Sequence, residues 1–535
     1  MNFEHFYDSK CAFNSIDDIK NKHITIMGLG LNGGGIASAL FFARYNAFVT
    51  ITDMKSETEL APSIETIKYS GVNMKNIRFV LGRHDIEDFK SADCVIKNPG
   101  VKFENNPYLA VAKHIETDLS IFLRFSPAPI IAITGSKGKS STASAIHFGL
   151  CNAGFNSFLG GNITVSPLSF FEKTTSNTPV VLELSSWQLS DLRGRNVLKP
   201  KIAVLTTIVP DHQNWYGAME PYVADKKLIY KNQTSSDATL CKANDKWGEI
   251  FATETKGSVV FYDTNVIQTE FFPKQNKKGA WLEKDGSGFF FEPNLKVPLF
   301  ECTRKIKPFQ NINWKENQVL GAKLKVPGIH MKENMLIAAA VLSIMGVSSY
   351  ETANILSEYN GIEHRLECFF EYKTSQEKSF RFYNDSAATV PEATAAALSS
   401  FEEPVVLILG GTDKQCSFEP LVKAINENLK SKKLKTLYLL EGTATQKFIE
   451  LLKNTNATKN SVVSKAIKTK PFDNLESLLK TLKTELDKID TKTTNKDALP
   501  VIVFSPGATS FGMFKNEFDR GNTFKKLVKQ IFDNL

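Results

Sequence analysis

Residues 129–154 read PIIAITGSKGKSSTASAIHFGLCNAG, in which an apolar strand-like run leads through a glycine-rich turn into a helical pattern. Such a turn is typical of phosphate-binding α/β folds, because its backbone N–H groups point at the anion. Lys139 would neutralise charge on the β- and γ-phosphates, and the Ser140 hydroxyl would face Mg²⁺. The Walker spacing is not met, because Ile133 stands where its first glycine would be. The strand-turn-helix context still favours a nucleotide site.

A second glycine turn, Gly28-Leu-Gly30-Leu-Asn-Gly33, lies between a strand-like run and a helical pattern over residues 36–46. Asp53 follows twenty residues after Gly33, at the end of the next strand-like run. This GxGxxG pattern is typical of a dinucleotide-binding Rossmann unit. A uridine diphosphate would need the same turn. The residues alone therefore leave open an NAD-binding oxidoreductase, a uridine diphosphate site and a turn without a ligand.

Polar residues also end later strand-like runs. Glu183 lies in VVLELSS at 180–186, and Asp211-His212 follows IAVLTTI at 202–208. Ligands of open α/β sheets bind at the carboxyl ends of the strands, and a carboxylate there suits Mg²⁺. Further strand-like runs at 404–410, 434–440 and 500–504 predict another α/β domain at the C-terminus.

The composition is that of an ordinary globular protein. The chain has 535 residues, 42% hydrophobic and 23% charged, which excludes a short peptide or a disordered chain and implies several domains. A net charge of +8 is too mild to indicate nucleic-acid binding. The seven cysteines are scattered singly, which argues against a disulfide framework or a thiolate zinc site. Without a signal-peptide pattern or an apolar run that could span a bilayer, we expect a cytoplasmic protein.

Two stretches do not follow the alternation of strands and helices. Residues 254–325 mix Phe-rich runs with Lys, Asn and Gly, which predicts a short-stranded antiparallel insertion. Residues 453–498 are crowded with Lys, Thr and Asn, which predicts solvated helices and loops.

The order of motifs along the chain resembles the Mur ligase family of ATP-dependent amino-acid ligases. After the TGxxGKS turn, the matching motifs are Glu183-Leu-Ser-Ser186, Asp211-His212, Tyr222-Val-Ala-Asp-Lys226, Gly328-Ile-His330, His364-Arg365-Leu-Glu367, Asn384-Asp385-Ser386, Gly410-Gly-Thr-Asp413-Lys414 and Ser505-Pro-Gly-Ala-Thr-Ser510. The GLGLNG start, Asn98-Pro99-Gly100 and the run FKNEFDRGNTF at 514–524 are most similar to the branch that adds D-glutamate.

The resemblance implies an α/β fold with three domains. Residues 1–120 would form a Rossmann-like domain for the UDP-linked substrate, and residues 121–360 a P-loop-like ATPase domain that contains the 254–325 insertion. Residues 361–535 would form a Rossmann-like domain for the amino acid. Closure of this last domain is expected before chemistry.

The resemblance also assigns site residues. The catalytic set would be Lys139, Glu183, His212 and Lys226. ATP would contact Gly135, Ser136, Lys137, Gly138, Lys139, Ser140, Ser141, Asn334, Arg365 and Asp385. Two Mg²⁺ would be held by Ser140, Glu183, His212 and Lys226, the last as a lysine carbamate. The UDP-linked substrate would contact Leu31, Asn32, Asp53, Lys55 and Asn162, and the amino acid Lys414 and Ser510.

The implied activity is ATP-dependent addition of D-glutamate to UDP-N-acetylmuramoyl-L-alanine through an acyl phosphate, a step of peptidoglycan precursor synthesis. We expect a monomer that needs no nucleic acid and no membrane span. Ala387 stands after Asn384-Asp385-Ser386 where a lysine is frequent in the D-glutamate branch. A ligase for another amino acid and a catalytically silent relative that binds nucleotides therefore remain alternatives.

Overall fold

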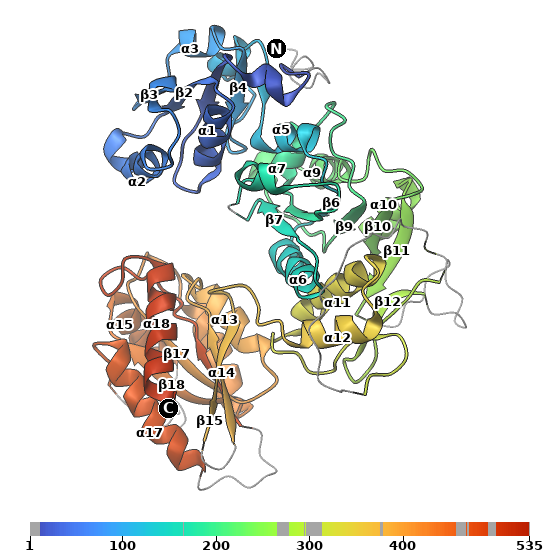
Figure 1. Ribbon diagram of the computed structural model, residues 1–535. Coiled ribbons are helices and arrows are strands. Elements are labelled where there is room, and N and C mark those ends of the chain that lie inside the picture. The colour runs from blue at the N-terminus through green and yellow to red at the C-terminus, as the bar shows by residue number, and fades with distance from the viewer. Residues whose placement is uncertain are drawn as a thin grey trace. The chain divides into compact units, whose positions relative to one another are not determined.

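The computed structural model describes residues 11–163, 165–264, 278–293, 295, 313–374, 378–455, 467, 470–490 and 499–533. Three β-sheets, each accompanied by helices, follow one another along this part of the chain (Figure 1). This confirms the predicted three-part α/β fold class. The chain divides into two compact units, residues 1–322 with 333–356 and residues 323–332 with 357–535. The predicted domain boundaries at 120 and 360 stay a prediction.

The first sheet consists of five parallel strands in the order β3-β2-β1-β4-β5. Its strands are β1 (His23–Met27), β2 (Phe48–Asp53), β3 (Ile77–Leu81), β4 (Cys94–Lys97) and β5 (Ile115–Glu116), and its helices α1 (Gly34–Arg44), α2 (Glu57–Lys68), α3 (Ile86–Lys90), α4 (Pro107–Ala110) and α5 (Asp118–Phe125). The central strand β1 is buried in four of its five residues, as expected for a parallel strand covered on both faces.

The second sheet has nine strands in the order β14-β13-β12-β11-β10-β9-β6-β8-β7. The strands are β6 (Ile130–Thr134), β7 (Phe158–Gly161), β8 (Val180–Glu183), β9 (Ile202–Leu205), β10 (Ala238–Lys242), β11 (Ser258–Asp263), β12 (Gly279–Leu282), β13 (Gly288–Phe291) and β14 (Gln318–Leu320). The helices are α6 (Lys139–Asn152), α7 (Ser186–Asp191), α8 (Gln213–Tyr216), α9 (Met219–Lys227), α10 (Lys246–Glu254), α11 (Ile329–Ile344) and α12 (Ser349–Ser357). The strand β6 lies between β8 and β9, so the turns that follow these three strands meet at one edge of the sheet.

Strands in the 254–325 stretch extend this same sheet. The strand β11 pairs in parallel with β10, and β12 in parallel with β11. The strands β12, β13 and β14 then pair antiparallel. The strand β11 thus completes a βαβ unit with the preceding β10 and α10, and the predicted antiparallel pairing is limited to the edge strands β12 to β14.

The third sheet has the order β15-β16-β19-β17-β18, with only β15 antiparallel. Its strands are β15 (Glu367–Lys373), β16 (Ser379–Asn384), β17 (Val405–Gly410), β18 (Leu434–Leu440) and β19 (Val501–Phe504), and its helices α13 (Pro391–Ser400), α14 (Glu419–Lys430), α15 (Thr443–Thr455), α17 (Leu475–Asp490) and α18 (Glu517–Phe532). Alternate residues of β17 face two different apolar clusters, Val405 and Leu407 one of them, Val406 and Ile408 the other. Helices therefore cover both faces of this sheet.

Within the 453–498 stretch, α17 is amphipathic rather than wholly solvated. Its residues Leu475, Leu478, Leu479, Leu482 and Leu486 are buried in the same cluster as Val406 and Ile408. Among the residues that the structure describes, no helix combines the length and the apolar character that crossing a membrane requires.

Candidate active site

The glycine-rich turn after β6 has the form expected of a phosphate-binding loop. Gly138 is the N-cap of α6 at φ 91°, a left-handed conformation that disfavours other residues. The Lys139 amino group folds back over the turn and donates hydrogen bonds to the Gly135 and Ser136 carbonyls at 3.0 and 3.1 Å. Burial lowers the pKa of Lys139. The lysine therefore lies at the turn that it is predicted to serve.

Lys226 from α9 reaches the same turn. Its side chain is almost fully buried, donates to the Gly135 carbonyl at 2.9 Å and lies 4.4 Å from the centre of the Tyr222 ring. The Tyr222 hydroxyl in turn lies 2.9 Å from the Ser136 hydroxyl. Burial, and then the nearby Lys139 charge, lower the pKa of Lys226 to about 7. Two lysines 87 positions apart in the chain thus converge on one carbonyl oxygen.

Glu183 lies at the end of β8, and one of its carboxylate oxygens accepts no hydrogen bond. Its Oε1 accepts a hydrogen bond from the Asn162 amide at 2.9 Å. Its Oε2 is buried and has no hydrogen-bond partner in the structure. A buried, unpaired carboxylate oxygen is costly unless a cation or donor satisfies it, so this position fits a magnesium ligand. The same contact places Asn162, predicted to bind the UDP-linked substrate, next to a predicted metal ligand.

His212 is less enclosed than Glu183. It is exposed, has a φ of 51° and caps the short helix α8, and its ring lies 5.1 Å from the Trp187 ring. Among the described residues, no three His, Cys, Asp or Glu side chains gather closely enough to hold a metal ion. A site built here therefore needs other donors, such as the half-buried Ser140 hydroxyl or the phosphates of the nucleotide.

Three residues that the sequence analysis did not assign support the turn. Thr206 donates its hydroxyl hydrogen bond to Lys137 O at 2.7 Å, and Ser136 N donates to Thr207 O at 2.8 Å. Glu333 bridges Thr207 and Lys242. The only sequence signal for the threonines is their place directly after the buried strand β9.

Three other residues predicted to contact ATP, Asn334, Lys137 and Ser141, lie at or beside the same glycine-rich turn. Asn334, assigned to the adenine, lies against the turn, because a Cβ atom on Gly138 would come within 2.5 Å of its Oδ1. Thr142 donates to the same oxygen at 3.3 Å. Lys137 is exposed and lies 3.5 Å from Asp211, and Ser141 is half-buried on the first turn of α6.

The N-terminal glycine turn is organised by a carboxylate. Asp53 Oδ2 accepts hydrogen bonds from Leu29 N and Gly30 N at 2.9 and 3.0 Å, and its Oδ1 accepts from Lys55 N at 2.9 Å. Asp53 is thus a support of the turn, whereas Leu31, Asn32 and Lys55 are exposed around it.

The remaining predicted ATP residues belong to the second unit. Asp385 is buried and accepts hydrogen bonds from Ser505 Oγ at 2.6 Å and from Leu366 N at 3.2 Å. Burial raises the pKa of Asp385 to about 7. Arg365 is exposed on the preceding turn. Asp385 therefore ties the HRLE and SPGATS motifs together.

A cavity of about 440 Å³ opens at the carboxyl ends of β17 and β18. Backbone and side chains of the GGT, EGT and TSFG segments line it, and Ser510 is among the lining residues. Lys414 is exposed and is not among them. The structure therefore joins only one of the two predicted amino-acid ligands to this cavity.

Known proteins resemble the chain over nearly its whole length. The model of the Mur ligase middle domain matches residues 133–342. A protein of Treponema pallidum (strain Nichols) named UDP-N-acetylmuramoylalanine--D-glutamate ligase is 40% identical, over 96% of this chain and 99% of its own. Proteins of the same name from Borreliella burgdorferi (strain ZS7) and Roseiflexus sp. (strain RS-1) are 36% and 32% identical, each over 96% of this chain and 99% of the relative.

Proposed function

The chain belongs to the Mur ligase family, and from that membership we propose that it joins D-glutamate to UDP-N-acetylmuramoyl-L-alanine at the expense of ATP. The observation that carries this proposal within the structure is the turn 135–138 with Lys139 and Lys226 on one carbonyl. Full-length relatives that share one name support D-glutamate as the added amino acid. They do not support an NAD-dependent oxidoreductase or a ligase for another amino acid.

The chemistry proceeds by activation of a carboxylate. An oxygen of the L-alanyl carboxylate attacks the γ-phosphorus of ATP, and the bond from this phosphorus to the β,γ-bridging oxygen breaks. The products of this step are ADP and an acyl phosphate. The D-glutamate amine then attacks the acyl carbon, the bond to the phosphate oxygen breaks, and the amine loses a proton. Lys139 holds and neutralises the phosphates during the first step, because its amino group already lies at the turn.

Glu183 and Ser140 are the residues that would hold Mg²⁺, with His212 nearer the surface. When bound, Mg²⁺ neutralises phosphate charge and orients the nucleotide. The fit rests on the buried Glu183 oxygen that has no hydrogen-bond partner. Asn162 fixes the orientation of that carboxylate through its other oxygen.

Lys226 fits the proposed carbamate. Carbamate formation joins the neutral amine to CO₂ and releases one proton, so it requires an amine that is not held protonated. Burial beside the second cation, Lys139, disfavours the ammonium form of Lys226. Conversion to a carbamate would replace a buried cation by an anion near Lys139, which relieves the repulsion between the two lysines.

The substrate sites follow the glycine turns. We place the UDP moiety at the N-terminal turn, where Leu31, Asn32 and Lys55 are exposed over Asp53. We place the amino acid near Ser510 in the cavity of the second unit, with Lys414 as the cation for its carboxylate. Because ATP and UDP-linked precursors are cytoplasmic metabolites, we propose that the protein acts in the cytoplasm. The expected monomeric state stays a prediction.

The proposal is tested by phosphate release with purified protein, ATP and Mg²⁺. Release should require UDP-N-acetylmuramoyl-L-alanine and D-glutamate together. A panel of other amino acids, including L-alanine, serves as the control. Turnover with another amine and none with D-glutamate would reassign the protein within the family.

A further inference from the structure

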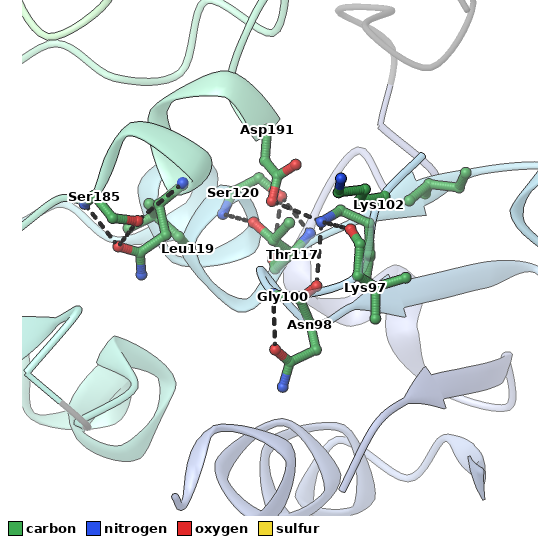
Figure 2. A network of polar contacts seen from close by, with 12 residues as sticks. Lys97, Asn98, Gly100, Lys102, Thr117, Leu119, Ser120, Ser185 and Asp191 are labelled. Carbon is green, nitrogen blue, oxygen red and sulfur yellow. Dashed lines mark hydrogen bonds and ion pairs between the residues drawn. The ribbon is translucent and has the colours of Figure 1, made fainter. Parts of the chain in front are cut away.

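Lys97, the last residue of β4, is a cation buried between the first and second sheets. Its amino group lies 2.9 Å from Asp191 Oδ2 on α7, and these two side chains are only 1% and 6% exposed (Figure 2). The same amino group donates hydrogen bonds to Asn98 O at 3.1 Å and to Val101 O at 2.9 Å. All three oxygens are thus gathered around one lysine.

The two carbonyls belong to the 98–101 turn beside the N-terminal glycine turn. Gly100 N donates to Asn98 Oδ1 at 3.1 Å, and Val101 N donates to Asn98 O at 3.0 Å, so the turn is closed on itself. A Cβ atom on Gly28 would lie 3.4 Å from Asn98 Cβ. The 98–101 turn therefore forms one wall of the proposed UDP site. Lys97 fixes this turn through its hydrogen bonds to the Asn98 and Val101 carbonyls.

Asp191 belongs to the ATP side of the same unit. The helix α7 begins just after Glu183 and ends at Asp191, and its Trp187 ring lies 5.1 Å from the ring of His212. Arg195 Nε donates to the Asp191 carbonyl at 2.7 Å, which fixes the end of the helix. The Lys97–Asp191 pair thus links the substrate-side turn to the helix that follows Glu183 and that contacts His212 through Trp187.

A second cation makes a parallel contact nearer the surface. Lys102 Nζ lies 3.8 Å from the centre of the Trp215 ring, and Trp215 lies against Trp187 with ring centres 4.7 Å apart. A cavity of about 110 Å³ separates the two contacts and is lined by both lysines, both tryptophans and Asp191. The segment 97–102 is therefore held at two points.

The buried pair is a poor source of stability. Removing two charges from water is costly, and an apolar pair of similar volume commonly stabilises a fold as well or better. Burial in fact raises the pKa of Asp191 to about 6 despite its cationic partner. Unlike an apolar pair, however, the Lys97 ammonium group orients two carbonyl groups of the 98–101 turn by hydrogen bonds.

We propose that Lys97 and Asp191 are positioning residues. They hold the 98–101 turn, and with it the UDP-linked substrate, at a fixed distance from Glu183 and His212. The inference rests on the proposed function, because it concerns the distance between a substrate carboxylate and ATP. Neither residue touches the reacting atoms in this account. A small displacement of the turn would lengthen the approach of the carboxylate to the γ-phosphate.

The decisive variant is the double exchange Lys97→Met with Asp191→Leu, which replaces the ion pair by apolar side chains. It should keep the melting temperature of the wild type or raise it. It should nevertheless lower kcat about tenfold or more and raise KM for the UDP-linked substrate several-fold, with KM for ATP within about twofold. The conservative variant Lys97→Arg keeps the charge and should retain most of the activity.

The control is Lys201→Met with Asp237→Leu. This ion pair lies in the same unit at 3.1 Å, with side chains 40% and 8% exposed, and neither residue bonds to the 98–101 turn or to Asp191. Its removal should change the melting temperature but leave both KM values and kcat within about twofold. Equal kinetic losses in the two double variants would overturn the inference, as would wild-type kinetics in Lys97→Met/Asp191→Leu.

Calorimetric binding of UDP-N-acetylmuramoyl-L-alanine separates this inference from the proposed function. The Lys97→Met/Asp191→Leu variant should bind several-fold more weakly than the wild type and the control. If the wild type binds this substrate but releases no phosphate with D-glutamate, the proposed function fails while the binding comparison still decides the role of Lys97. Equal affinities in all three proteins would refute that role.

Discussion

The two glycine turns of the first unit end in similar glycine caps, but the side chains that contact them have opposite charge. Gly33 and Gly138 both cap a helix at φ 85° and 91° after a buried parallel strand. In the N-terminal turn, the Asp53 carboxylate occupies two backbone N–H groups. In the central turn, two lysine amino groups occupy the Gly135 carbonyl. In the proposed function both turns bind phosphate groups, and we propose that the neighbouring charges decide at which of them a phosphoryl group is transferred.

The largest expected effect comes from removing a cation of the central turn. Lys139→Ala should lower kcat by at least about a thousandfold, because charge on the transferring phosphoryl group loses its compensation. The melting temperature should stay near that of the wild type. Lys90→Ala is the control, since Lys90 is an exposed lysine of α3 and belongs to neither glycine turn. Phosphate release within tenfold of wild type in Lys139→Ala would show that the two turns do not differ as described.

Lys226 tests the second lysine of the central turn. Lys226→Gln keeps a hydrogen-bond donor to Gly135 O but cannot form a carbamate, and it should lower kcat about a hundredfold. Wild-type protein in CO₂-depleted buffer should lose activity and regain it when bicarbonate is added. The variant should not respond to bicarbonate. Activity of the wild type that is independent of bicarbonate would remove the carbamate from the proposed site.

Asp53 tests the support of the N-terminal turn. Asp53→Ala removes the acceptor for three backbone N–H groups, those of Leu29, Gly30 and Lys55, and should raise KM for the UDP-linked substrate about tenfold, with KM for ATP unchanged. Asp53→Asn retains an acceptor oxygen and should have a smaller effect. If both variants instead lowered kcat with KM unchanged, the N-terminal turn would take part in chemistry, and the contrast between the turns would fail.

The smallest expected effect is at the exposed tip of the N-terminal turn. Asn32→Ala should raise KM for the UDP-linked substrate about fivefold, more than it lowers kcat, because it removes binding and no charge. Initial rates over a range of substrate concentrations give both constants. An unchanged KM would move the uridine site away from this turn.

Much of the fold was predictable because its signals are local. Apolar strand-like runs ending in glycines at 28–33, 135–138 and 410–411 predicted three α/β regions, and three sheets are observed. The Phe-rich stretch 254–325 was harder, because short apolar runs do not reveal whether a strand pairs in parallel. The described strands there pair in both ways.

The sequence proposed residues for the candidate site but did not indicate their partners. Lys139 and Lys226 were both assigned by resemblance, yet their meeting at Gly135 O depends on the packing of α9 against the turn. Asn334 and Asn162 were assigned to adenine and to the UDP-linked substrate, and the structure places them against Gly138 and Glu183. Lys97 and Asp191 carried no sequence signal, because a lone lysine at a strand end is usually solvated.

The amino-acid sequence by itself determined that the protein has strand-turn-helix units suited to phosphates, since glycine conformation and hydrophobic periodicity act over a few residues. It also determined the family, through the order of its motifs. Only the tertiary structure decided which charges face each turn, because Asp53, Lys226 and Asp191 reach their partners across 23 to 94 residues of chain. Burial there replaces water by a few fixed neighbours, and those neighbours set the charge and the position of each group.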